Sequence, residues 1–211
     1  MAVIMKQATK LAIAVIFLAL SLAAATAQQK VLLVLKNGSE DMSTMLKEEV
    51  GVMVELLQKA GYQPIVATVT GQLLNGGSVS LQPDLKFADV DISDYAGVMV
   101  PCMGLGMGRG IAEEGVALVK EAGDRDLPIA AETGGVEFLS RAGVLKGKHF
   151  TIWPGLQYAI SGGIFDGTDI SQDGAIITAS TCPLRATVEK PATTELLTNR
   201  FIGLLSARNA R

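Results

Sequence analysis

The chain has 211 residues, of which 49% are hydrophobic and 18% are charged, and its formal net charge is −3. This mild acidity, without a cluster of lysine or arginine residues, argues against nucleic acid as a partner. The length suits one domain with its own core, and two cysteines are too few for a disulfide-rich scaffold.

The N-terminal 27 residues have the pattern of a secretory signal peptide. Lys6 and Lys10 precede an apolar stretch, residues 11–25, and Ala-Thr-Ala at 25–27 matches a signal-peptidase site. The stretch is short for a membrane span of about 20 residues, although an uncleaved anchor stays open as an alternative. We expect a periplasmic or secreted protein, cleaved after Ala27, without stable membrane insertion and with one domain over residues 28–211. Loss of the two lysines shifts the net charge from −3 to −5.

From residue 30 onward, apolar runs of strand length alternate with helical patterns. Continuous apolar runs are typical of strands that are buried on both faces of a parallel sheet. The stretch between residues 71 and 94 is rich in turn residues and predicts a hairpin or meander. The alternation predicts an α/β fold with an open, mostly parallel sheet and helices on both faces. The predicted strands are 30–35, 64–69, 95–101, 127–131, 149–153 and 175–180, and the predicted helices are 46–57, 111–122, 133–142 and 192–207.

Four loops are expected at the carboxyl ends of the strands, where ligands bind in such folds. They are 38–41 (Gly-Ser-Glu-Asp), 101–104 (Pro-Cys-Met-Gly), 131–135 (Ala-Glu-Thr-Gly-Gly) and 180–183 (Ser-Thr-Cys-Pro). The third loop has the small-x-nucleophile-x-small spacing of a nucleophile elbow, in which the apex residue occupies a strained turn. Thr133 lies at that apex.

Together these segments resemble the ThiJ/PfpI superfamily over essentially the whole mature chain. The resemblance rests on KVLLVL with GSED, on GSVSLQPDLKFADVDISDYAGVMVP, on PIAAETGGVEFLSRAGVLKGKHFT and on DGAIITAS. Within these stretches AGVLKGK is the most specific. The resemblance implies a flavodoxin-like three-layer α/β/α sandwich, similar to class I glutamine amidotransferases, and a homodimer.

The same resemblance implies a site that has lost its usual nucleophile. In the superfamily, a cysteine at the elbow apex is activated by a glutamate after the first strand, and backbone N–H groups form an oxyanion site. Here Glu40 matches the glutamate, Thr133 replaces the cysteine and Gly134 replaces a histidine that many members have. Cys102 occupies the first glycine of the superfamily's PGG turn.

Thr133 is a poor candidate nucleophile, because a hydroxyl needs an adjacent general base. The only histidine, His149, is expected at an exposed strand edge away from the site, and the carboxylate of Glu40 is a weak base unless it is desolvated. We therefore expect Thr133 to contact a ligand or to fill space.

Cys102 has three open interpretations. In the first, Cys102 is a relocated nucleophile beside Glu40, with elbow amides as oxyanion donors. In the second, it is one half of a disulfide with Cys182. In the third, it is a buried structural thiol. An oxidising compartment would permit the disulfide. The sequence does not establish the Cα separation that a disulfide requires.

Two further patterns are weak. Glu40 and Glu132 could form an acidic metal site, but helix-spaced histidine ligands are missing and we expect no metal; Glu132 could instead form a salt bridge with Arg109 or face solvent. GLGMGRG at 104–110 follows a strand, yet its spacing differs from a dinucleotide-binding motif, so no cofactor is expected. This stretch is more typical of a flexible loop over the pocket, where Arg109 could pair with an anionic ligand.

We therefore expect a non-catalytic protein, or one of altered activity, that binds a small carbonyl or carboxylate ligand. The expected ligand contacts are Gly104, Glu132, Gly134 and Arg109. The alternative is a hydrolase, glyoxalase or deglycase that uses Cys102 or Thr133 with Glu40. A purely structural or interaction role is the third hypothesis.

Overall fold

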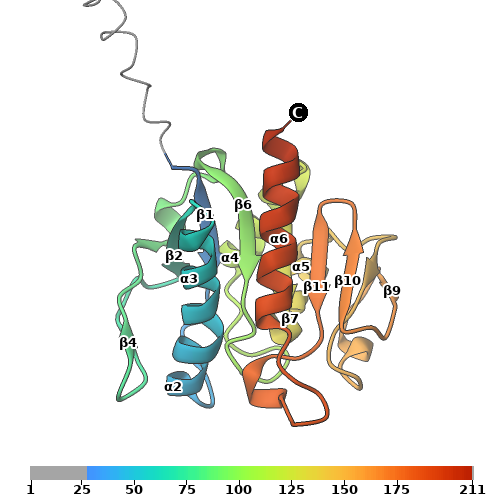
Figure 1. Cartoon of the computed structure of the whole chain (residues 1–211), viewed down its shortest axis with the longest axis horizontal. Helices are drawn as coiled ribbons and strands as arrows, with labels where there is room; N and C mark the ends of the chain where they lie inside the picture. The colour runs from blue at the N-terminus through green and yellow to red at the C-terminus, as the bar shows by residue number, and fades with distance from the viewer. Residues whose placement is uncertain (1–27, 211) are drawn as a thin grey trace, which may run out of the picture.

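The computed structural model describes residues 28–210 (Figure 1). The predicted signal peptide and its cleavage site lie outside the described residues. Across 28–210, none of the helices combines the length and the apolar character that crossing a membrane requires.

The main sheet contains seven strands in the order β10-β11-β7-β6-β1-β2-β5. Neighbouring strands are parallel, except that β10 at one edge is antiparallel to β11. This mostly parallel sheet confirms the α/β fold predicted from the sequence. The strands are β1 (Lys30–Val34), β2 (Gln63–Thr68), β5 (Leu85–Lys86), β6 (Tyr95–Val100), β7 (Ile129–Glu132), β10 (Ile170–Asp173) and β11 (Ile176–Ala179).

Two small strand pairs lie outside the main sheet. The turn-rich stretch contains the predicted hairpin, formed by β3 (Leu74–Asn75) and β4 (Ser80–Leu81). The predicted strand 149–153 is only two residues long, and β8 (His149–Phe150) pairs with β9 (Ile164–Phe165). Strand β10 was not expected from the sequence, because its residues ISQD are mostly polar and only one of them is buried.

Helices cover both faces of the sheet (Figure 1). Helices α3 (Gly51–Lys59) and α6 (Thr194–Asn209) pack on one face, and α4 (Glu113–Asp124) and α5 (Val136–Arg141) pack on the other. Alternate residues of β1 contribute to two separate buried clusters: Leu33 belongs to one and Leu32 to the other. Burial on both faces explains why this strand is a continuous apolar run.

The helix that follows β1 contains an irregular turn. It begins with α2 (Met42–Thr44), continues through the π-helical turn η1 (Met45–Val50) and leads directly into α3. Asp41 caps its start by accepting a hydrogen bond from the backbone N–H of Thr44 at 3.0 Å. Single π-helical turns are rare and are frequent at functional sites. This one buries the carboxyl group of Glu49 behind the site.

Short 3-10 turns connect several of these elements. They are η2 (Phe87–Asp89), η3 (Ile92–Asp94), η4 (Thr133–Gly135), η5 (Gln157–Ala159) and η6 (Pro183–Arg185).

Candidate functional site

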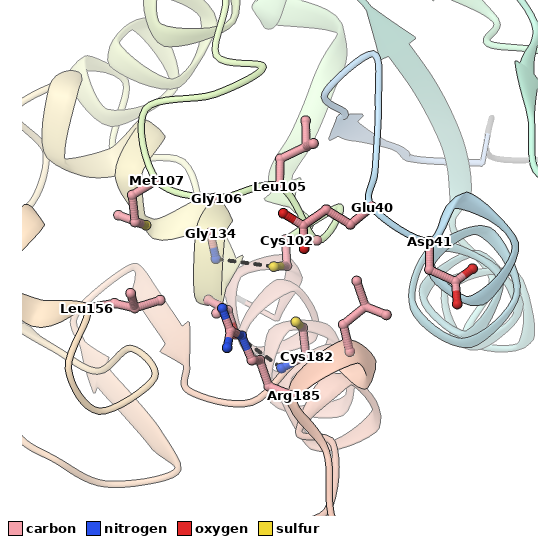
Figure 2. Close-up of a pocket in the computed structure, with 13 residues that line it drawn as sticks. Glu40, Asp41, Cys102, Leu105, Gly106, Met107, Gly134, Leu156, Cys182 and Arg185 are labelled. Atoms are coloured by element: carbon pink, nitrogen blue, oxygen red, sulfur yellow. Dashed lines mark hydrogen bonds between the residues drawn. The ribbon is translucent and has the colours of Figure 1, made fainter.

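A cavity of about 270 Å³ lies where the loops after β1, β6, β7 and β11 meet (Figure 2). All four loops that the sequence places at the strand ends contribute to it. Of the residues singled out in the sequence, Glu40, Cys102, Gly104, Thr133, Gly134 and Cys182 line this cavity. The size suits a ligand of a few heavy atoms, since sites for drug-sized ligands usually start at about 300 Å³.

The loop after β7 is a strained elbow, as the sequence pattern indicates. Thr133 has a φ of +41°, and a positive φ in a β-branched residue is a genuine outlier that surrounding structure must hold in place. At Gly135, a Cβ atom would lie 2.1 Å from the carbonyl oxygen of Val100. The elbow therefore packs directly against the end of β6.

The hydroxyl of Thr133 is occupied by structural hydrogen bonds. Its Oγ1 donates to the carbonyl oxygen of Ser180 at 2.9 Å and accepts from the backbone N–H of Cys182 at 3.1 Å. The residue is 2% exposed. Neither partner is a base that could remove the hydroxyl proton, so this geometry favours an anchoring role over nucleophilic attack.

This anchoring role predicts different effects for two substitutions of Thr133. Thr133→Val keeps the shape and leaves a buried carbonyl and a buried N–H without their partner, which costs about 1–3 kcal/mol of unfolding free energy. Thr133→Ser keeps the hydroxyl, so it should be the milder change. Urea unfolding of both variants checks the order, and equal destabilisation would contradict the anchoring role.

Cys102, which follows β6, is the reactive side chain that the site favours. It is 3% exposed, and its Sγ accepts a hydrogen bond from the backbone N–H of Gly134 at 3.4 Å (Figure 2). A hydrogen bond from Cys182 is the main cause that lowers the pKa of the Cys102 thiol to about 6. The N–H groups of Gly134 and Gly104 and the charge of Lys36 lower this pKa further, against burial, which raises it. Cys102 is thus a thiolate at neutral pH.

Cys182 has the opposite character. Its thiol donates toward Cys102, and this hydrogen bond, burial and the negative charge of Cys102 all raise its pKa. Both cysteines are buried free thiols in the structure. The disulfide that the sequence permits is therefore not formed here, and the two sulfurs instead make a thiolate–thiol pair.

Glu49 supports the loop that carries Cys102. Its Oε1 accepts from the backbone N–H of Cys102 at 2.7 Å, and its Oε2 accepts from that of Met103 at 3.0 Å. Met103 and Gly104 both have positive φ angles, 54° and 57°. The buried carboxyl group therefore holds a loop conformation that is costly for Met103.

Glu132 is the hydrogen-bond partner of Glu49 and does not lie where the sequence predicts it. The side chain is fully buried, and its oxygens accept from Thr193 at 2.9 Å and Thr194 at 2.7 Å. Burial raises the pKa of Glu132 to about 7 and raises that of Glu49 well above its usual range. Glu49 keeps its proton and donates a hydrogen bond to the carboxylate of Glu132. The expectation that Glu132 meets Arg109 or solvent is wrong.

Glu40 and Arg109 pair with each other. The guanidinium of Arg109 lies 2.6 Å from the carboxylate of Glu40, and both side chains are more than half exposed. Glu40 lines the cavity, whereas Arg109 is outside its lining. No hydrogen bond joins Glu40 to Thr133 or Cys102 among the described side chains. This arrangement gives little support to Glu40 as a general base.

Lys36 is a buried cation that the sequence analysis overlooked. It lies two residues after the end of β1, is 1% exposed, and its Nζ donates to the carbonyl oxygen of Gly134 at 3.4 Å. Burial lowers its pKa, while the negative charge of Cys102 is the largest influence that raises it. Lys36 therefore places positive charge beside the thiolate.

Between residues 28 and 210, no cluster of histidine, cysteine and acidic side chains could hold a metal.

His149 lies at a strand edge, as expected. Its side chain is 53% exposed, and its Nδ1 is 2.6 Å from Asp166. It does not line the cavity.

Comparison with known proteins agrees with the fold. A family model described as the DJ-1/PfpI family matches residues 29–186. An uncharacterized protein of Archaeoglobus fulgidus is 28% identical over 153 residues, which cover 71% of this chain and 88% of that protein.

Two solved structures show the same fold at low sequence identity. The ThiJ/PfpI domain protein from Brachyspira murdochii is 18% identical, with a TM-score of 0.70 and coverage of 86% of this chain and 99% of that chain. Drosophila melanogaster DJ-1beta is 22% identical, with a TM-score of 0.67 and coverage of 86% and 92%.

Proposed function

The chain belongs to the DJ-1/PfpI family, and we propose that it is a member of altered activity that binds a small carbonyl or carboxylate compound over Cys102. The observation that carries this proposal is the Cys102 thiolate at the floor of the cavity, with the N–H of Gly134 directed at its sulfur. The elbow hydroxyl of Thr133 is already engaged by Ser180 and Cys182. The reactive group has thus moved from the elbow to the neighbouring loop.

A thiolate in this position can add to a carbonyl carbon. The sulfur forms the S–C bond, the carbonyl oxygen takes a proton from water, and the product is a thiohemiacetal. The cavity also offers Arg185, an exposed side chain without an ion-pair partner among the described residues. A guanidinium binds carboxylates with two hydrogen bonds. A small aldehyde acid such as glyoxylate therefore combines both features.

Alkylation kinetics test this proposal. With iodoacetamide, we expect the rate at Cys102 to rise with pH around a midpoint near 6, the pKa of its thiol, and we expect Cys102→Ala to abolish this phase. Peptide mapping by mass spectrometry assigns the modified residue. Glyoxylate should slow the reaction in a saturable way.

Substitution of Arg185 separates the two contacts. Arg185→Gln should weaken protection by glyoxylate and leave protection by the uncharged glycolaldehyde unchanged. An alkylation midpoint near the ordinary thiol value of about 8.5, or no protection by either compound, would overturn the proposal.

We also propose that the mature protein is exported and forms a homodimer. Export is supported by the charged, apolar and small-residue pattern of residues 1–27. The homodimer rests on the resemblance to the family.

A further inference from the structure

Two consecutive elbow residues hold the two cysteines of the chain against each other. The backbone N–H of Gly134 donates to the Sγ of Cys102 at 3.4 Å, and the hydroxyl of Thr133 accepts from the backbone N–H of Cys182 at 3.1 Å. The thiol of Cys182 donates toward Cys102. The elbow therefore positions both cysteines, one with each hydrogen bond. A single relocated nucleophile would not require the second of these contacts.

The access to this pair restricts its reaction partner. Cys102 is 3% exposed and Cys182 is 1% exposed, and both face the cavity of about 270 Å³ (Figure 2). A disulfide in a folded partner protein would have to expose its sulfurs inside this cavity, whereas a hydroperoxide enters as a free small molecule. The geometry thus favours a small oxidant.

The two sulfurs also differ in the way that a two-step oxidation requires. Attack needs a thiolate, and resolution needs a second thiol in contact with the first sulfur. The hydrogen bond from Cys182, the N–H groups of Gly134 and Gly104 and the charge of Lys36 stabilise negative charge on Cys102, whereas that same hydrogen bond, burial and the Cys102 thiolate keep Cys182 protonated. Each cysteine is thereby assigned one role.

We propose that Cys102 and Cys182 form a two-thiol redox site that reduces small hydroperoxides and is oxidised to an intramolecular disulfide. The Cys102 thiolate attacks one peroxide oxygen, the O–O bond breaks, and the leaving oxygen takes a proton and departs as alcohol or water. Cys102 is then a sulfenic acid. The sulfur of Cys182 loses its proton and attacks that of Cys102, the S–O bond breaks, and water leaves as the S–S bond forms. A small dithiol reduces the disulfide and restores both thiols.

This site shares Cys102 with the proposed function but depends on Cys182 in a separate way. Serine can replace the hydrogen bond from Cys182 but not its nucleophilic sulfur, and alanine replaces neither. Cys182→Ser should therefore keep the alkylation midpoint of Cys102 near 6, while Cys182→Ala should raise it. Both variants should fail to form the disulfide.

The test uses the reduced mature chain, residues 28–211, treated with one equivalent of hydrogen peroxide or of cumene hydroperoxide. The wild-type chain should lose two free thiols and about 2 Da, and dithiothreitol should restore both. Cys182→Ser should instead gain about 16 Da as a sulfenic acid that dimedone traps. Cys102→Ser should consume no peroxide.

Two results would overturn this inference while leaving the proposed function intact. One is a wild-type chain that gains about 32 Da at Cys102, as a sulfinic acid, with Cys182 still free. The other is disulfide formation between chains instead of within one chain, detected by non-reducing electrophoresis. Absence of low-pH alkylation at Cys102 would instead contradict the proposed function.

Discussion

Gly135→Ala is expected to destabilise the protein by more than about 3 kcal/mol, beyond the usual range for overpacked cores. The new Cβ would lie 2.1 Å from the carbonyl oxygen of Val100 and 2.9 Å from that of Pro101. Both are backbone atoms at the end of β6, where Val100 is paired with Ala131 of β7. They cannot move away without disturbing this pairing. The same shift would displace the loop that carries Cys102, so its low-pH alkylation should also be lost.

A matched control comes from the C-terminal helix. Gly203 lies on the exposed face of α6, and nothing lies within 4 Å of a Cβ built there. Gly203→Ala should stabilise the protein by about 0.5–1 kcal/mol, because alanine favours the helical backbone. Urea unfolding of both variants gives the comparison. If the free energy of unfolding of Gly135→Ala lies within about 1 kcal/mol of the wild-type value, the close packing of the elbow on β6 is contradicted.

The sheet and the elbow could be predicted because their signals are local. Apolar runs identify buried parallel strands, and the alternation with helical patterns brings the four loops to one edge of the sheet. The spacing of small residues around Thr133 identifies the strained turn, and its φ of +41° confirms the strain. The short strands were less visible, because β5 and β10 contain few buried apolar residues.

The burial of the ionisable side chains in the site was harder to predict from the sequence. Glu49 lies three residues after Leu46 and four before Met53, so its spacing places it on the apolar face of the helix. This was a usable signal, but charged residues are almost never buried unless they are paired. Its partner, Glu132, comes from the distant β7. Only the fold reveals that the two carboxyl groups meet.

The choice of acidic residue shows the limit of matching by motif. Glu40 occupies the loop after β1, where the resemblance places an activating glutamate, yet its side chain is exposed and bound to Arg109. Hydrogen bonds, first from Cys182 and then from Gly134 and Gly104, lower the pKa of Cys102 most, and the charge that adds to them is the cation of Lys36. In the sequence, Lys36 directly follows the predicted strand 30–35 and carries no local signal of burial. Its buried ammonium group contacts Gly134, which lies far along the chain.

Glu132 and Cys102 give the free energy of unfolding opposite dependences on pH, with folded-state pKa values of about 7 and about 6. Burial also raises the pKa of Glu49 well above its usual range, which adds a dependence of the same sign as that of Glu132. The pKa of Glu132 is raised from 4.5 to about 7 on folding, so its contribution is fully present below pH 4.5 and is lost as the pH rises through 7. The pKa of Cys102 is lowered from 9.0 to about 6, so its contribution is present above pH 9 and is lost as the pH falls through 6. Burial lowers the pKa of Lys36, so Lys36, like Cys102, makes the free energy of unfolding rise with pH. Each limb amounts to on the order of 3 kcal/mol.

Two variants separate the limbs of this profile. Glu132→Gln cannot titrate, so the fall in stability between pH 4.5 and 7 should shrink, while the contributions of Cys102 and Glu49 remain. Cys102→Ser should show the reverse. Urea unfolding across this pH range measures the slopes, and comparing slopes cancels the exposed His149–Asp166 pair, which all three proteins share. If the stability of Glu132→Gln falls as steeply between pH 4.5 and 7 as that of the wild-type protein, the pKa of Glu132 is not raised on folding. A group makes stability depend on pH only when it binds its proton more tightly in one of the two states than in the other.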